Sequence, residues 1–205
     1  TFIPVPGVDP VALKDFFDQH PGLPLSEVIQ AAPPHKNLDV APSDLRLAWT
    51  AEALSGRPKK EDLLRRSLRT VENDYQWIVI DTPPSLGVMT QNAVAAADLI
   101  LIPAPAEARA ANAIADLLEL AHVLKGESFD NFRILLTRVD SRKSRTNQAV
   151  QAALDPWSDK VLSVTIPQSE PLNQAQMARR DIFRFAASSP GACAYRDLIH
   201  ELQRL

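Results

Sequence analysis

The stretch of residues 77–87, with the sequence WIVIDTPPSLG, most constrains what this chain can fold into. Its first four residues, 77–80, are apolar and run straight into a lone aspartate, Asp81. A short continuous apolar run with several β-branched residues predicts a strand buried on both faces, as in parallel sheets. Ligands of open α/β sheets bind just beyond the carboxyl ends of the strands, which is where Asp81 falls. Because Pro83 and Pro84 fix the backbone, we expect a rigid loop that holds a carboxylate at the rim of a sheet.

Short apolar runs alternate with helical patterns along the rest of the chain. The predicted strands are 38–42, 77–80, 99–103, 132–137 and 161–164, and the main predicted helices are 45–54, 58–73, 89–97, 107–124, 143–154 and 192–205. Such alternation indicates βαβ units and right-handed crossovers. We therefore predict an α/β fold with a mostly parallel, doubly wound sheet flanked by helices. Residues 1–205 are expected to form one domain, with an irregular or helical segment at 1–37 and a core at 38–205.

The composition excludes several classes of protein. No apolar run approaches the roughly 20 residues that a membrane span needs, and no signal peptide is expected. The single cysteine, Cys193, excludes an internal disulfide framework and fits a reducing compartment. The four histidines lack the spacing of metal ligands. Ser85 lacks the context of a hydrolase nucleophile.

Positive charge is concentrated in clusters, although the net charge is −3. The first cluster consists of Arg138, Arg142, Lys143 and Arg145, and the second begins with Arg179 and Arg180. Arginines where a loop becomes a helix can neutralise DNA phosphates without reading the base sequence, and such binding depends steeply on salt. The alternative for both clusters is a solvated charged face. A third cluster, at 57–69, is offset by acids and is predicted to be the outer face of an amphipathic helix.

The stretch 77–87 and several later segments together resemble the ParA/MinD family of deviant Walker ATPases, most closely its ParA branch. The later segments, in chain order, are Ala97-Asp98, Ile102-Pro103, the run LLTRVDSR at 135–142, Thr165-Ile166-Pro167, and GACAY at 191–195. The resemblance extends over roughly residues 38–205. It implies a P-loop NTPase-like fold and, since ParA proteins bind DNA non-specifically, supports DNA contacts by the first two clusters.

The resemblance also implies a Walker B role for Asp81, which would hold Mg²⁺ through a water molecule. Mg²⁺ prefers oxygen ligands and keeps several waters beside one or two carboxylates and the substrate phosphates. The alternative is that Asp81 only caps the following turn. The nucleotide contacts that the resemblance implies are Thr82, Pro83, Thr137, Asp140 and Pro167. The turns at 137–140 and 166–167 would flank the adenine, and the alternative is that they are ordinary strand-to-helix turns.

The phosphate-binding turn of the family is missing from this sequence. The family opens with a strand and a glycine-rich turn carrying two lysines, followed by a second strand that ends in an aspartate positioning the attacking water. Here the six glycines are scattered, and no Gly-Lys-Thr or Gly-Lys-Ser occurs. Without a backbone cradle and a lysine for the phosphates, Asp81 alone is not expected to bind ATP tightly. Either an N-terminal part lies outside this sequence or the protein is a natural short form.

Two main hypotheses follow. The first is a ParA-like partition ATPase of the cytoplasm that is associated with the nucleoid. With its P-loop region it would use ATP and Mg²⁺, form a homodimer around two ATP molecules and work with non-specific DNA and a ParB-like centromere-binding protein. The 205 residues alone would carry no catalytic residue. The second is a nucleotide-independent short form that binds DNA or a partner. A membrane-cycling MinD-like ATPase is a weaker third, because the last helix lacks a cationic polar face, so no stable membrane association is expected.

Overall fold

The computed structural model describes residues 15, 17, 24–107 and 110–205. Its elements are η1 (Leu25–Glu27), β1 (Gln30–Ala31), β2 (Asp39–Val40), α2 (Leu47–Leu54), η2 (Lys60–Asp62), α3 (Leu63–Leu68), η3 (Glu72–Asp74), α4 (Val88–Ala96), β3 (Ile100–Pro105), α5 (Ala110–Lys125), β4 (Phe132–Thr137), α6 (Ser144–Ala153), η4 (Asp155–Lys160), α7 (Glu170–Met177), α8 (Ile182–Phe185) and α9 (Pro190–Leu202). The irregular or helical segment predicted at 1–37 lies largely outside the described residues.

The chain divides into two compact units. The first unit consists of residues 1–97 and 120–127, and the second unit of residues 98–119 and 128–205. The predicted turns at 137–140 and 166–167 and the two arginine clusters all belong to the second unit. The loop that carries Asp81 belongs to the first unit.

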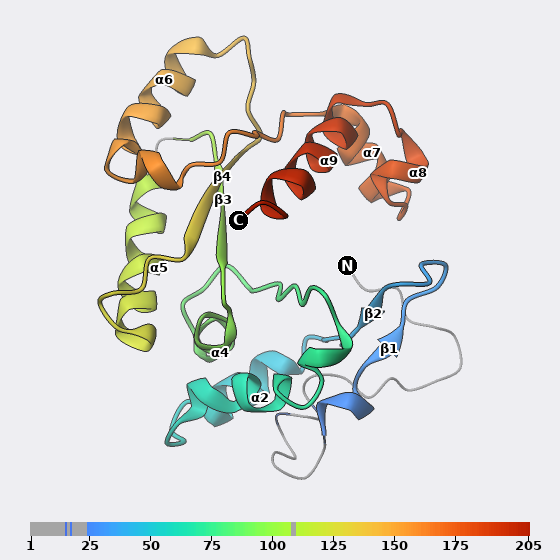
Figure 1. The fold of residues 1–205 in the computed structure, drawn as a ribbon, viewed down its shortest axis with the longest axis vertical. Helices are drawn as coiled ribbons and strands as arrows, with labels where there is room; N and C mark the ends of the chain where they lie inside the picture. Colours follow the sequence, from blue (N-terminus) through green and yellow to red (C-terminus); the bar gives the residue numbers. More distant parts are fainter. Residues whose placement is uncertain (1–14, 16, 18–23, 108–109) are drawn as a thin grey trace. The chain divides into compact units, whose positions relative to one another are not determined.

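The second unit is built on a parallel pair of strands. β3 and β4 pair from Ile100 opposite Phe132 to Pro105 opposite Thr137. Residues 161–167 run parallel along the other edge of β4 through isolated bridges and two N–H···O bonds of 2.9 and 2.8 Å. Figure 1 shows α6 on one side of these strands and α7–α9 on the other. The parallel α/β prediction is confirmed, but the strand predicted at 161–164 pairs only intermittently.

β4 is buried on both faces, as its apolar sequence predicts. Ile134, Leu135 and Leu136 are all at most 6% exposed. Leu135 packs in a cluster with Leu162, Ile166 and, from α9, Leu198. Two sides covered by apolar neighbours are what a near-continuous aliphatic strand requires.

The first unit has its own core around α4. Its buried apolar residues are Phe17, Leu25, Val28, Leu54, Leu64, Val71 and Val88. A polar side chain, Asn92 of α4, is fully buried among them. Its Oδ1 accepts from the backbone N–H of Leu64 at 3.0 Å, and its Nδ2 donates to the carbonyls of Lys60 at 2.8 Å and Val88 at 2.9 Å. These bonds tie α4 to η2 and α3.

The single helix predicted at 58–73 is wrong. The structure divides this stretch into η2, α3 and η3, with Lys59 in the left-handed region at φ 55°. The apolar residues Leu64 and Val71 still face the core. The amphipathic pattern therefore predicted the buried face correctly, while the contact with Asn92 fixes where α3 begins.

The buried strand predicted at 77–80 is also wrong. This run forms no strand and is unpaired, with Trp77 56% exposed and Val79 89% exposed. A strand needs hydrogen-bonding neighbours, and none of the residues described by the structure supplies one to this run. Only Ile80 packs against the core of the first unit.

The remaining predicted elements agree with the structure within a few residues at each end. Gly126, at φ 98°, follows α5 in the left-handed conformation that commonly ends a helix. Two helices, α7 and α8, precede the predicted last helix, α9. None of the helices in the described part of the chain combines the length and apolarity that a membrane crossing requires.

Candidate functional site

Two turns predicted to face a ligand lie together at the carboxyl ends of the parallel strands. The carbonyl of Thr137 accepts from the N–H of Ala106 at 3.0 Å, which extends the β3–β4 ladder by one step. Val139 pairs with the next segment, donating to Ile166 at 3.1 Å and accepting from Gln168 at 3.0 Å. The structure therefore brings the turn 137–140 and Pro167 side by side. This edge is where open α/β sheets bind ligands.

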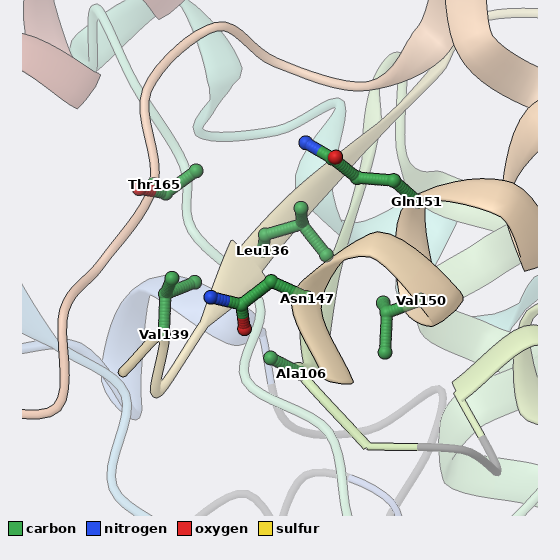
Figure 2. A pocket seen from close by; sticks show the side chains of 7 residues that line it. All are labelled: Ala106, Leu136, Val139, Asn147, Val150, Gln151 and Thr165. Carbon is green, nitrogen blue, oxygen red and sulfur yellow. The ribbon is translucent and has the colours of Figure 1, made fainter. Parts of the chain in front are cut away.

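A small pocket of about 240 Å³ opens beside these turns. Figure 2 shows its lining side chains, which come from β4, from α6 and from the segments that follow the strands. They are Ala106, Leu136, Val139, Asn147, Val150, Gln151 and Thr165. Four of the lining side chains are apolar, and the other three carry two amides and a hydroxyl. The predicted contacts Thr137, Asp140 and Pro167 lie one or two positions from lining residues in the sequence but do not line this pocket themselves.

Asp140 is engaged by the residue two positions further on. Its Oδ1 accepts from the backbone N–H and the Nε of Arg142 at 3.1 and 2.9 Å, and its Oδ2 accepts from Nη2 at 2.9 Å. The side-chain hydrogen bonds from Arg142, and then its backbone N–H, lower the pKa of Asp140 to about 2. The Asp140 carbonyl also accepts from the Nδ2 of Asn147 at 3.0 Å. Asp140 therefore fixes the turn that leads into α6 and stays ionised at neutral pH.

The start of α6 carries uncompensated positive charge. Lys143 and Arg145 are exposed and make no ion pair within the described part of the chain. The helix has no acidic residue in its first turn and no side-chain cap at Lys143. Since the N-terminal end of a helix is already electropositive, cations placed there raise the local potential and favour a bound anion. Arg138, 3.8 Å from the Oε1 of Glu107, adds a further exposed cation at φ 55°.

Arg179 and Arg180 lie in the turn between α7 and α8. The N–H of Arg180 donates to the carbonyl of Ala175 at 2.9 Å, and the N–H of Arg179 donates to Gln176 at 3.1 Å. With Arg179 at φ 52°, this is a Schellman motif with arginine where glycine is usual. Both side chains are exposed, so their placement is compatible with the predicted contacts to phosphates.

Asp81, Thr82 and Pro83 lie on an exposed loop of the first unit. Asp81 makes no hydrogen bond or ion pair with any residue that the structure describes. In the same described ranges, no three His, Cys, Asp or Glu side chains group together as a metal site. Mg²⁺ needs only one or two protein carboxylates when waters and phosphates complete its shell. A single free carboxylate therefore fits Mg²⁺ as one of several ligands, with the others coming from outside this loop.

Several residues of these sites escaped prediction. Asn147 and Gln151 are four positions apart, so their amides share one face of α6, and this spacing was the available signal. Thr165 gave no comparable signal, because its place in the pocket depends on contacts with other segments. The pairing of Asp140 with Arg142 was predictable only as a local Asx turn.

Comparison with known proteins agrees with this geometry. A family model described as an AAA domain matches residues 20–134. The sporulation initiation inhibitor protein Soj of Bacillus subtilis is 32% identical over 170 residues, which cover 82% of this chain and 67% of Soj. The chromosome partitioning protein ParA of Myxococcus xanthus is 31% identical, over 82% of this chain and 60% of that protein.

A solved structure extends the likeness to three dimensions. A protein of Borrelia burgdorferi B31, described as a plasmid partition protein and bound to AMPPNP, superposes with a TM-score of 0.77 at 26% identity. The match covers 97% of this chain and 76% of the Borrelia protein. The fold is therefore that of P-loop NTPases, and the predicted resemblance is confirmed. The chain belongs to the ParA/MinD family of deviant Walker ATPases, in its ParA branch.

Proposed function

We propose that this chain forms part of a DNA-partition ATPase of the ParA type. The observation that carries the proposal is the meeting of the turns 137–140 and 166–167 at the carboxyl end of the parallel strands. In this position the turns would flank the adenine of ATP, with Thr137, Asp140 and Pro167 nearest to it. The AMPPNP bound to the Borrelia protein supports a nucleotide at this fold.

Asp81 would bind the metal ion that accompanies a nucleotide. Its exposed carboxylate would hold Mg²⁺ through a water molecule, with Thr82 and Pro83 shaping the loop around it. Bound Mg²⁺ would neutralise charge on the phosphates of the nucleotide. Asp81 itself has a narrower task, which is to present an ionised oxygen from a loop made stiff by Pro83 and Pro84.

The cradle for the phosphates would come from a segment outside these 205 residues, because the sequence contains no glycine-rich, lysine-bearing turn. The chain spans 67% of Soj and 60% of ParA, so both relatives have additional length that could carry such a turn. On this proposal the 205 residues bind ATP weakly by themselves. The ATP-bound protein would form a homodimer, respond to a ParB-like centromere-binding protein and associate with the nucleoid in the cytoplasm.

The cationic start of α6 would bind DNA phosphates. Arg142, Lys143 and Arg145 stand on one loop-to-helix transition, beside Arg138, and two of them lack acidic partners in the described residues. Arg179 and Arg180 would add contacts from the turn after α7. Contacts of this kind provide affinity without base specificity, which suits a protein that moves over bulk DNA.

ATP hydrolysis by the protein from the complete reading frame tests the proposal. We expect Mg²⁺-dependent hydrolysis that Asp81→Ala abolishes and that Asp74→Ala, which removes another exposed carboxylate of the first unit, leaves unchanged. A reading frame that includes a P-loop but yields a protein without nucleotide binding would overturn it.

A second candidate function is favoured by the completeness of the second unit. Its turns and cationic helix start are formed without any contribution from a P-loop, so it could act as a nucleotide-independent DNA-binding module. The 205-residue chain would then bind duplex DNA without ATP. Replacing Arg142, Lys143 and Arg145 by alanine should reduce the slope of log K against log salt by about 3, at ~0.9 per phosphate contact. The matched control replaces Arg65, Arg66 and Arg69, and equal losses in both triple variants would contradict this function.

A further inference from the structure

We infer that Thr90 is a positioning residue, which fixes the loop that carries Asp81 to the first turns of α4. The inference rests on the proposed function for the role of Asp81. The contacts that support it all lie within the first unit.

The loop is held almost entirely by two side chains of α4. Thr90 is 4% exposed, and its hydroxyl lies 2.5 Å from the carbonyl oxygen of Ser85 and 3.5 Å from that of Pro83. The hydroxyl has one proton and donates it to the nearer carbonyl, that of Ser85. The Nε2 of Gln91 donates to the carbonyl of Leu86 at 3.1 Å.

These contacts matter because the loop has little else to hold it. Residues 81–87 are all exposed, and the loop closes on itself only through the N–H of Ser85, which donates to Pro83 at 2.7 Å. Pro83 and Pro84 remove two φ rotations, so an anchor at Ser85 is transmitted towards Asp81. The buried hydroxyl of Thr90 therefore restricts the range of positions that the exposed carboxylate of Asp81 can adopt.

The anchor is itself attached to a fixed point. Asn92, two residues beyond Thr90, is 0% exposed and makes all three of its hydrogen bonds to backbone groups of η2, α3 and α4. A carboxylate that holds a metal-bound water must be kept within about 0.5 Å of its productive position, which demands a rigid support behind it. Asn92 holds α4 in place, and Thr90 extends that rigidity to the loop.

The test compares Thr90→Val, which removes the hydroxyl at nearly constant volume, with Thr90→Ser, which keeps it. Gln91→Met is a second, milder variant that weakens the same loop from a less buried position. Ser67→Ala is the matched control, because Ser67 is a buried hydroxyl in the same unit that donates to its own helix at Leu63. The measurements, on protein from the complete reading frame, are backbone ¹⁵N order parameters at Thr82 and Ser85, and the Mg²⁺ concentration for half-maximal ATP hydrolysis.

Thr90→Val should lower the order parameters from about 0.85 to below about 0.6. It should raise the Mg²⁺ midpoint about tenfold, while hydrolysis at saturating Mg²⁺ falls far less. Thr90→Ser should restore both values, Gln91→Met should shift both in the same direction by less, and Ser67→Ala should leave both unchanged.

Unchanged order parameters in Thr90→Val and Gln91→Met would overturn the inference. A mobile loop with an unshifted Mg²⁺ midpoint would overturn it too, because Thr90 would then be only structural. If the unaltered protein hydrolyses no ATP, the proposed function fails, and the metal-positioning role of Thr90 fails with it. The order parameters would then show whether the contact with the loop is real.

Discussion

β4 and the run 77–80 have similar sequences but different fates in the structure. Both are short aliphatic runs that end near a polar turn, and both are predicted to be buried strands. β4 has β3 on one edge and residues 161–167 on the other, and its Ile134 is 0% exposed. The run 77–80 has no partner on either edge among the described residues, and Val79 is 89% exposed. An aliphatic run therefore has the capacity to be a strand, and its neighbours decide whether it becomes one.

The turn after β4 and the loop after 77–80 differ in the same way as the runs that precede them. The turn after β4 is held by hydrogen bonds on both sides and is ready to face a ligand. Among the described residues, the side chains that hold the loop after 77–80 are Thr90 and Gln91 of α4. We interpret the second unit as complete in itself, and the loop of the first unit that carries Asp81 as dependent on further contacts.

The largest expected effect comes from truncating the same kind of side chain in the two runs. Ile134→Ala removes a fully buried side chain and should destabilise the protein by about 3–5 kcal/mol, from lost burial and the cavity left behind. Val79→Ala removes an exposed side chain and should cost less than about 0.5 kcal/mol. Urea unfolding followed by circular dichroism measures both. Similar losses would show that 77–80 is buried in solution.

Asn92→Ala tests how firmly α4 is held within the first unit, which also contains the unpaired run 77–80. It leaves the N–H of Leu64 and the carbonyl of Lys60 without their buried partner and should cost about 2–3 kcal/mol. Asn131→Ala is the matched control in the second unit, since Asn131 is exposed and donates to Asp98. We expect that change to cost at most about 1 kcal/mol. Equal costs in urea unfolding would mean that α4 is not the fixed point from which the loop is held.

Glu201 of α9 accepts two backbone hydrogen bonds from the segment 161–167, which lies beside β4. Burial opposes its ionisation, but the backbone N–H groups of Ser163 and Val164, at 2.7 and 2.9 Å, outweigh burial and lower its pKa. A lowered folded pKa gives stability that is present above the unfolded pKa and is lost as the pH falls through the folded one. Glu201→Gln should therefore cost about 1–2 kcal/mol at neutral pH and progressively less in acid.

The pH dependence of the free energy of unfolding, measured in wild type and Glu201→Gln, checks this role of Glu201. The two stability curves should converge as the pH falls below the range in which a glutamate ordinarily titrates. A constant gap between them down to acid pH would contradict the role of the Glu201 charge. It would also mean that residues 161–167 remain paired with β4 without the hydrogen bonds to the Glu201 carboxylate.

The smallest effect concerns how the two runs end. β4 is followed by Arg138 at φ 55°, a left-handed conformation that glycine adopts at less cost, whereas 77–80 leads into two prolines. Arg138→Gly should stabilise the protein by about 0.5–1 kcal/mol, and Arg138→Ala should not. Thermal unfolding distinguishes the two variants. Equal stabilities would indicate that the turn relaxes in solution.

Much of the fold could be predicted because it depends on local pattern. Residues 132–137 were predicted to be a strand and form β4 with the same bounds. A short aliphatic run between two helical patterns is typical of a buried strand. The helix predicted at 58–73 failed because the contact of Asn92 with Leu64, which are 28 residues apart, sets the start of α3. No local pattern records such a contact.

The candidate site was predictable to the level of segments. The turns at 137–140 and 166–167 were expected at strand ends and lie there, because parallel strands bring their carboxyl ends to one edge. The pairing of Asp140 with Arg142 and the hydrogen bond from Thr90 to the loop that carries Asp81 were not predicted. They depend on side-chain directions in irregular loops, which the sequence does not specify.

Hydrogen exchange of the backbone amides tests the central contrast most directly. In the 205-residue chain, the amides of 133–136 should exchange only through global unfolding of their unit, and those of 77–82 should exchange at nearly the rate of an unfolded peptide. This result would confirm that β4 is a fully paired strand and that the run 77–80 of the same chain is unpaired. Comparable protection of 77–82 and 133–136 would contradict the account, because the run before Asp81 would then already have its neighbours.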